Sequence, residues 1–202
     1  MKLYYLPGAC SMATKISLTE AGQDFEAIAV DRATKKTADG KDFNTINPKG
    51  YVPALVLHDG MVLTENVAVL AYVASLDSTH QLGPQPGSFD YYRLLEWLAY
   101  INCEVHKNLS PLFRPDTSEE AKTAAHAMVI RRLTYIEDKL GDRPYLMGDD
   151  FTVADAYLYV TLSWGPRTGV DISKLPWLTA YYERCRTRPS VQQVRKAEGL
   201  PP

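Results

Sequence analysis

The sequence predicts an α/β domain at residues 1–80 and an all-helical domain at residues 89–202, joined by a linker at residues 81–88. Strand and helix patterns alternate in the first segment, whereas only helical patterns occur in the last. The linker contains two glycines and two prolines, which interrupt regular structure. With 202 residues, 46% of them hydrophobic, the chain can bury a core in one large or two small domains.

The expected elements of the first domain follow the order β-α-β-α-β-β-α. Apolar runs bounded by turn residues mark the strands, and apolar residues at helical spacing mark the helices. In chain order they are a strand at 3–6, a helix at 10–21, a strand at 25–30, a short helix at 42–46, two strands flanking a hairpin at 59–60, and a helix ending near 76. This order resembles a thioredoxin-like domain.

The second domain shows helical spacing throughout. A first apolar stripe consists of Leu94, Leu98, Ile101 and Val105. A long helix is expected from about 118 to 140, and a last one at 175–188, where Pro189 ends it. Thr152 and Asp155 have the spacing of a capping box at the start of another helix, so we assign them to folding and not to catalysis.

Composition and charge exclude several classes of protein. The formal net charge is −2 and the basic residues are scattered, which predicts no nucleic-acid surface. No apolar run approaches the roughly 20 residues that span a bilayer, and the N-terminal run is too short for a signal peptide, so no membrane association and a cytoplasmic location are expected. Three widely spaced cysteines argue against disulfides and against a metal site. The histidines at 58, 80 and 126 show no metal or triad spacing.

Val52 precedes Pro53 at the start of an expected strand. Because proline has no N–H and is tolerated only at a strand's first residue, edge or bulge, the backbone groups of Val52 stay unpaired. An extended peptide could pair with these groups as an added strand. A cis bond between Val52 and Pro53 would turn them outward.

The segment Thr64-Glu65-Asn66 lies where an expected strand meets a helix. A helix start offers free N–H groups to a carboxylate, and Glu65 can receive an ammonium group, so an amino-acid head fits here. The alternative is that Thr64 or Asn66 is only an N-cap and Glu65 only a favourable first-turn charge.

Cys10 is expected in the first turn of the first helix. A helix start stabilises a thiolate and lowers the thiol pKa, so Cys10 is a candidate reactive group; inert packing is the alternative. The next three residues contain no second cysteine, which disfavours a two-thiol oxidoreductase. Any disulfide formed by Cys10 would therefore be a mixed one, with a small thiol.

His106 shares a helix face with Cys103 and Asn102, and an imidazole there could contact a sulfur held near Cys10. Glu104 lies roughly 200° around the helix from His106 at about 100° per residue. If both contact a ligand, Glu104 reaches the site of a neighbouring subunit. Lys35 could meet a ligand carboxylate, although loop lysines and helix-surface histidines are more often simply solvated.

Together these segments resemble a cytosolic glutathione transferase of the bacterial beta class. The similarity covers nearly the whole chain, and its motifs are Met1-Lys2-Leu3-Tyr4-Tyr5, Pro7-Gly8-Ala9-Cys10-Ser11, Lys35-Lys36-Thr37, Asn47-Pro48-Lys49-Gly50-Tyr51-Val52-Pro53-Ala54-Leu55, Thr64-Glu65-Asn66, Glu104-Val105-His106-Lys107 and Ala197-Glu198-Gly199-Leu200.

The resemblance implies a cis Val52-Pro53 bond, a homodimer, and reduced glutathione as co-substrate without a permanently bound cofactor. By similarity, Cys10 and His106 are catalytic, and Cys10 sits close enough to the glutathione sulfur to form a mixed disulfide. The glutathione-binding set implied is Cys10, Lys35, Tyr51, Val52, Glu65, Asn66, Cys103, Glu104 and His106. Within it, Val52 pairs with the cysteinyl part, and Glu65 with Asn66 holds the γ-glutamyl head. The helical domain would form the electrophile pocket and the dimer contacts.

One departure from the beta class concerns Thr14 and Lys15, which stand where the class usually has Pro and His. Lys15 would further favour a Cys10 thiolate if it faced the site.

Three functions are compatible with the sequence. The first is conjugation of glutathione to an apolar electrophile. The second is glutathione-dependent disulfide reduction by Cys10 as a monothiol. The third is non-enzymatic binding of apolar ligands in a pocket built from aromatic residues of the second domain: Tyr91, Tyr92, Trp97, Tyr100, Tyr157 and Trp164.

Overall fold

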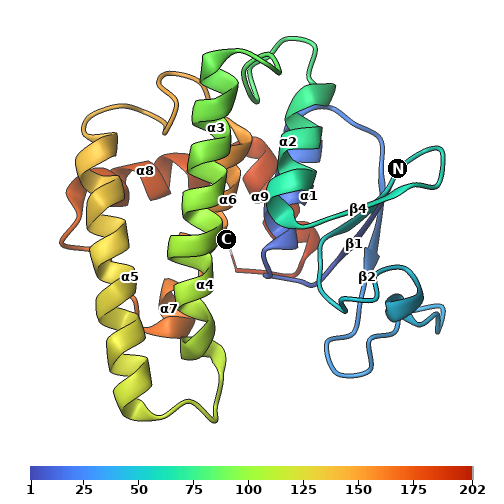
Figure 1. Cartoon of the computed structure of the whole chain (residues 1–202), viewed down its shortest axis with the longest axis horizontal. Coiled ribbons are helices and arrows are strands. Elements are labelled where there is room, and N and C mark those ends of the chain that lie inside the picture. The colour runs from blue at the N-terminus through green and yellow to red at the C-terminus, as the bar shows by residue number, and fades with distance from the viewer. Residues whose placement is uncertain (202) are drawn as a thin grey trace.

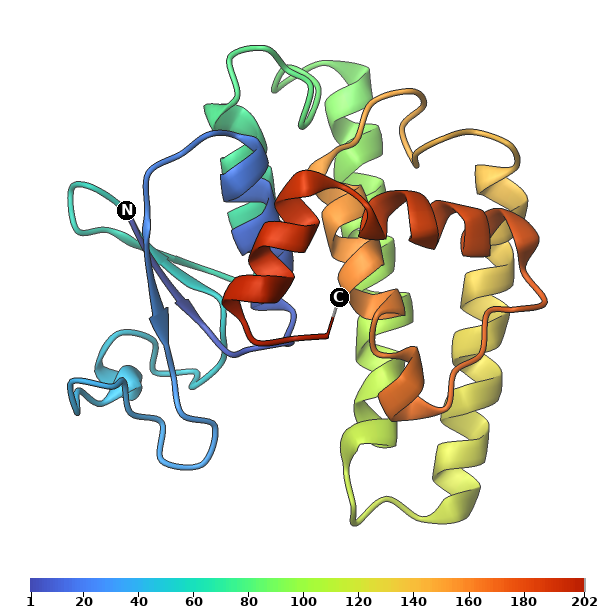
Figure 2. The same ribbon diagram turned by 180° about the vertical axis from the view of Figure 1, so that it is seen from behind.

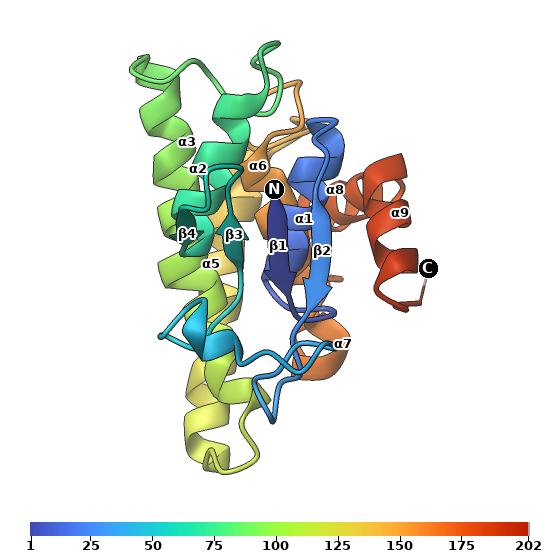
Figure 3. The same ribbon diagram turned by 90° about the vertical axis from the view of Figure 1, so that its right-hand side faces the viewer.

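A four-stranded sheet forms one side of the molecule, in a computed structural model that describes residues 1–201. Its strands are β1 (Lys2–Tyr5), β2 (Glu26–Ala29), β3 (Ala54–Val56) and β4 (Val62–Thr64), in the spatial order β2-β1-β3-β4 (Figure 3). β1 pairs in parallel with β2 and antiparallel with β3, and β3 pairs antiparallel with β4. The Val52-Pro53 bond just before β3 is cis, as the resemblance implies.

Side chains alternate across the sheet as the two-residue period of a strand requires. Leu3 and Leu55 pack on one face, against buried residues of α1 (Ser11–Glu20) and α2 (Asn66–Leu76). Tyr4 and Ala54 pack on the other face, with Phe43 of the short helix η1 (Phe43–Thr45). Helices α1 and α2 therefore lie between the sheet and the helical domain (Figure 1).

The remainder of the chain is helical. Its elements are α3 (Phe89–Tyr100), the π-helical η2 (Ile101–His106), α4 (Lys107–Leu109), the 3-10 turn η3 (Ser110–Phe113), α5 (Glu119–Leu140), α6 (Val153–Leu162), α7 (Gly165–Thr168), α8 (Pro176–Arg186) and α9 (Pro189–Ala197). The hydroxyls of Ser88 and Ser118 accept N–H groups in the first turns of α3 and α5. The segments α3, η2 and α4 form one long rod beside α5 (Figure 1).

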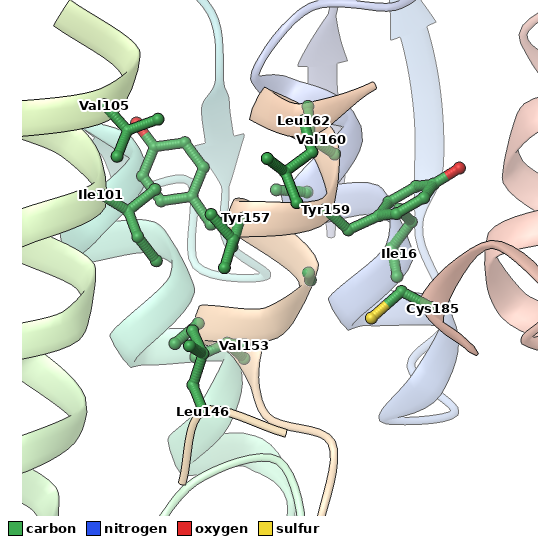
Figure 4. Packing of buried hydrophobic residues seen from close by; sticks show 14 of the residues in the cluster. Ile16, Ile101, Val105, Leu146, Val153, Tyr157, Tyr159, Val160, Leu162 and Cys185 are labelled. Atoms are coloured by element: carbon green, nitrogen blue, oxygen red, sulfur yellow. The ribbon is translucent and has the colours of Figure 1, made fainter. Parts of the chain in front are cut away.

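Helix α6 is the centre of the hydrophobic core, and all ten of its residues are buried. Figure 4 shows Tyr157 pointing toward the helix that carries Ile101 and Val105. Met12 and Ile16 of α1 belong to the same continuous cluster. The two halves of the chain thus share one core, although the linker separates them in sequence.

The element order expected from the sequence is confirmed, with differences near the C-terminus. The helix expected at 175–188 ends at Arg186. Pro189, which was expected to end the last helix, is instead the first residue of a further helix, α9. Proline is accommodated there because the first residue of a helix needs no N–H partner. Figure 2 shows α9 beside α1, so the chain returns to its N-terminal half. The division at residues 81–88 stays a prediction.

Within residues 1–201 no helix is both long enough and apolar enough to cross a membrane.

Candidate active site

A cavity of about 350 Å³ lies between the sheet domain and the helical domain. Five of the residues expected at the site line it: Cys10, Lys35, Tyr51, Val52 and His106. Phe113 and Trp164 complete its apolar wall from the helical side. A larger hollow of about 530 Å³, beside the Glu20–Arg188 ion pair, has neither cysteine nor histidine in its lining. The smaller cavity is therefore the candidate site.

Cys10 immediately precedes α1, and its Sγ lies 3.3 Å from the carbonyl oxygen of Val52, to which it donates. Among the loop hydrogen bonds of residues 1–201, none uses the Val52 N–H. That donor is therefore free for an extended ligand, as expected from the following proline.

The sequence-based expectation of a lowered Cys10 pKa is wrong for this structure. Loss of hydration raises the pKa of the Cys10 thiol to about 11, and the backbone N–H groups of Cys10 and Ser11 offset only part of that effect. Burial outweighs the helix start here because an unpaired thiolate loses more solvation than two N–H groups restore. Cys10 is thus a thiol at neutral pH.

The turn before Cys10 is fixed by residues from the far end of the chain. Gly8 has a positive φ of 66°, and its N–H donates to Glu198 Oε2 over 2.8 Å. The indole Nε1 of Trp164 donates to the Gly8 carbonyl over 2.9 Å. On the other side, Asn66 Nδ2 donates to the Cys10 carbonyl over 3.2 Å. In this structure the contribution of Asn66 to the site is therefore to fix the backbone of Cys10.

Thr14 and Lys15 both face away from the cavity. The Thr14 hydroxyl donates to Asn66 Oδ1 over 3.1 Å. Lys15 is buried, with Nζ 3.5 Å from Glu198 Oε1 and 3.9 Å from the ring centroid of Tyr5. Lys15 therefore does not supply the positive charge beside Cys10 that the sequence allowed.

His106 is part of a hydrogen-bond chain that fixes its protonation. The Tyr157 hydroxyl lies 2.9 Å from Asn102 Oδ1 and 2.7 Å from His106 Nδ1. Since the hydroxyl proton goes to the amide oxygen, His106 Nδ1 must carry its own proton and donate to the tyrosine oxygen. Burial, with Lys107 nearby, lowers the pKa of His106 to about 4. The imidazole is therefore neutral, with its lone pair on Nε2.

Glu65, Asn66, Cys103 and Glu104 are not brought into this cavity. Glu65 has a positive φ of 69°, which is unusual for a residue with a side chain, and its Oε1 pairs with Lys49 Nζ at 2.7 Å. Cys103 is exposed, and Glu104 Oε2 pairs with Arg132 Nε at 2.7 Å. Glu104 and His106 both belong to η2, which is π-helical and not the α-helix assumed for their spacing.

Three arginines that the sequence analysis did not single out also line the cavity. Arg32 comes from the loop after β2, Arg114 follows η3, and Arg167 is part of α7. They lie far apart in the sequence in irregular or very short segments, so periodicity gives no signal for them. Of the six aromatic residues expected to line a pocket, only Trp164 lines this cavity.

Within residues 1–201 no group of three or more His, Cys, Asp and Glu side chains is placed to hold a metal ion.

Comparison with protein families matches both halves of the chain. Residues 1–75 match the family model described as the glutathione S-transferase N-terminal domain, and residues 100–189 match the corresponding C-terminal domain. Glutathione S-transferase GstA of Escherichia coli O157:H7 is 44% identical over 200 residues, which is 99% of this chain and 100% of that protein.

Solved structures agree with this comparison. A sphingomonad glutathione S-transferase complexed with glutathione is 48% identical, has a TM-score of 0.95, and is matched over 100% of both chains. The bacterial beta-class glutathione S-transferase of Sphingomonas chungbukensis is 46% identical, with a TM-score of 0.95 and 100% of both chains covered.

Proposed function

The chain belongs to the glutathione S-transferase family, and from this membership we propose that it binds reduced glutathione in the cavity beside Cys10 and joins its sulfur to an apolar electrophile. The observation that carries the proposal is the convergence of Cys10, Val52 and His106 on one cavity between the two halves of the molecule.

The proposed position of glutathione follows from the free polar groups. The free N–H of Val52 pairs with the cysteinyl residue, as an added strand would. Glu65 receives the γ-glutamyl ammonium in place of the Lys49 ammonium, which contacts it in the structure. The glutathione sulfur then lies near Cys10 and His106, with Lys35 and Tyr51 at the edge of the cavity.

His106 has the protonation state needed to activate this sulfur. Its Nε2 accepts a hydrogen bond from the glutathione thiol, and the cationic side chains around the cavity favour loss of the proton to solvent. The thiolate forms a carbon–sulfur bond with the electrophile, and the leaving group departs with its electron pair. Cys10 remains a thiol that hydrogen-bonds to Val52.

The proposal includes a homodimer. Glu104 is expected to reach the glutathione site of the partner subunit, and for this it would exchange its ion pair with Arg132. A cytoplasmic location also stays a prediction.

A Cys10→Ala variant separates conjugation from the second candidate function, monothiol disulfide reduction. Because the nucleophile in conjugation is glutathione itself, the variant should keep glutathione-dependent turnover of 1-chloro-2,4-dinitrobenzene and lose exchange with a glutathione mixed disulfide. Cys185→Ala is the control for removal of a thiol, since Cys185 lies outside the cavity and outside the expected glutathione-binding set.

Two outcomes would contradict conjugation as the main activity. Wild-type protein that reduces mixed disulfides but turns over no electrophile would favour monothiol reduction. Retention on immobilised glutathione without either activity would favour a non-enzymatic binding protein.

A further inference from the structure

The lining of the candidate site has an excess of positive charge. Arg32, Lys35, Arg114 and Arg167 all face the cavity, and no aspartate or glutamate lines it. The chain as a whole has a net charge of −2, so this local excess is not a consequence of composition. A cavity lined by charges of one sign attracts ligands of the opposite sign.

The three arginines are also unpaired. Within residues 1–201 the guanidinium groups of Arg32, Arg114 and Arg167 form no ion pair and no hydrogen bond with another residue. Arg93, Arg132, Arg186 and Arg188, outside the cavity, each pair with a glutamate. The capacity of the cavity arginines to bind carboxylates is therefore unused by the protein itself.

The four cations form two groups that belong to different walls. Arg32 and Lys35 come from the loop after β2, on the side of Tyr51 and Val52. Arg114 and Arg167 come from the helical domain, on the side of Phe113 and Trp164.

The helical wall combines aromatic faces with guanidinium groups. The Arg167 guanidinium lies 5.0 Å from the ring centroid of Phe113. The rings of Phe113 and Trp164 meet edge to face at 5.5 Å, and Trp164 lies 4.9 Å from the ring of His106. This wall suits a flat apolar group with a carboxylate at its edge.

We propose that the second substrate is an aromatic electrophile that carries a carboxylate, and that Arg114 and Arg167 bind this carboxylate. The inference depends on the proposed binding of glutathione along the sheet-domain wall. Glutathione brings two carboxylates of its own, and Arg32 and Lys35 lie on that wall to meet one. Arg114 and Arg167 remain for the electrophile, whose ring packs against Phe113 and Trp164 and whose reacting carbon points to the sulfur near His106.

The test compares two substrates that differ in charge at one position: 4-chloro-3,5-dinitrobenzoate and 4-chloro-3,5-dinitrobenzamide. In both, the carbon–sulfur bond forms as chloride leaves with its electron pair. Each kcat/KM is divided by the rate constant of the uncatalysed reaction with glutathione, which removes the difference in intrinsic reactivity. The ratio of these corrected kcat/KM values, benzoate over benzamide, should exceed one in the wild type and fall about tenfold in the double variant R114Q R167Q.

Arg131→Gln is the matched control, since Arg131 is exposed on α5 and lies outside the cavity. It should leave the ratio at the wild-type value. An unchanged ratio in R114Q R167Q would overturn the inference. So would a rise in the KM for glutathione that lowers both rates equally, because the two arginines would then bind glutathione.

A binding measurement separates failure of this inference from failure of the proposed function. Quenching of tryptophan fluorescence by 3,5-dinitrobenzoate and by 3,5-dinitrobenzamide, which lack the reactive chloride, reports binding without turnover. Tighter binding of the benzoate, lost in R114Q R167Q, supports the inference even if neither chloride substrate reacts. Equal binding of the two compounds to the wild type contradicts it.

Discussion

His106 is held neutral by the groups around it. Tyr157 comes from α6 and Asn102 from the first turn of η2, and both must be in place before Nδ1 of His106 has an acceptor for its proton. The aromatic rings of Tyr157 and Trp164 meet His106 edge to face and reduce its contact with water. The same contacts that orient Nε2 toward the cavity therefore resist protonation.

The lowered pKa of His106 makes stability depend on pH. Between the ordinary pKa of about 6.5 and the folded-state value of about 4, the unfolded chain binds a proton at this residue and the folded chain does not. Lowering the pH from 7 to 5 should therefore destabilise the fold, by about 2 kcal/mol from this residue alone. Urea unfolding at both pH values gives the loss in free energy of unfolding for the wild type and for His106→Gln. The difference between the two losses is the contribution of His106.

His126→Gln is the control for this measurement, because it removes a histidine that lies outside the cavity, where its Nε2 contacts the Gly169 carbonyl. An equal loss of stability between pH 7 and 5 in His106→Gln and wild type would show that His106 is protonated in the folded state.

The sequence predicted the site residues that lie in local motifs and missed the contacts that tertiary packing creates. Cys10, Val52 and His106 were found because a helix start, a proline and helical spacing are local patterns. Tyr157 was expected to line an apolar pocket, and its contact with His106 was missed because it joins residues 51 positions apart. The direction of the Cys10 pKa shift was wrong because burial is a tertiary property.

Helix α6 depends on a carboxylate that satisfies four donors. Asp155 is fully buried and accepts hydrogen bonds from the N–H of Leu146, the N–H and hydroxyl of Thr152, and the hydroxyl of Tyr181. These bonds fix the loop before α6 and join it to α8. The capping role expected from the sequence is thus confirmed, and the contact with Tyr181 extends it.

Replacing Asp155 by Ala should destabilise the protein by about 3 kcal/mol or more, because it leaves buried donors without an acceptor. The midpoint and slope of urea unfolding measure the effect. Asp150→Ala, an exposed aspartate of the same loop, should change stability by less than about 0.5 kcal/mol. A similar small effect for Asp155→Ala would mean that water replaces the carboxylate.

Hydrophobic periodicity predicted the long helices correctly, whereas Pro189 led to a wrong prediction near the C-terminus. Helix α5 was expected because its apolar residues recur over many turns. Helix α9 was missed because Pro189 can end one helix or begin the next, and local sequence does not distinguish the two. The π-helical form of η2 was also missed, because the stripe through Ile101 and Val105 fits an ordinary helix.

Across the whole molecule, the C-terminal segment holds the N-terminal half at two places. Arg188 forms two hydrogen bonds with the carboxylate of Glu20 at the end of α1. Glu198 accepts the Gly8 N–H next to Cys10 and lies against the Lys15 ammonium. The turn before Cys10 therefore depends on a residue 190 positions away in the sequence.

The Lys15–Glu198 pair allows this connection to be tested, since both side chains are almost completely buried. Burial raises the pKa of Glu198, and removing the lysine leaves that charge without its partner. We expect Lys15→Met and Glu198→Gln each to cost about 3 kcal/mol, because each leaves an unpaired buried charge. The double variant should cost less than the sum, since the glutamine can still accept the Gly8 N–H and no charge remains. Urea unfolding of the four proteins gives the coupling energy, and strictly additive losses would show that the two charges do not interact.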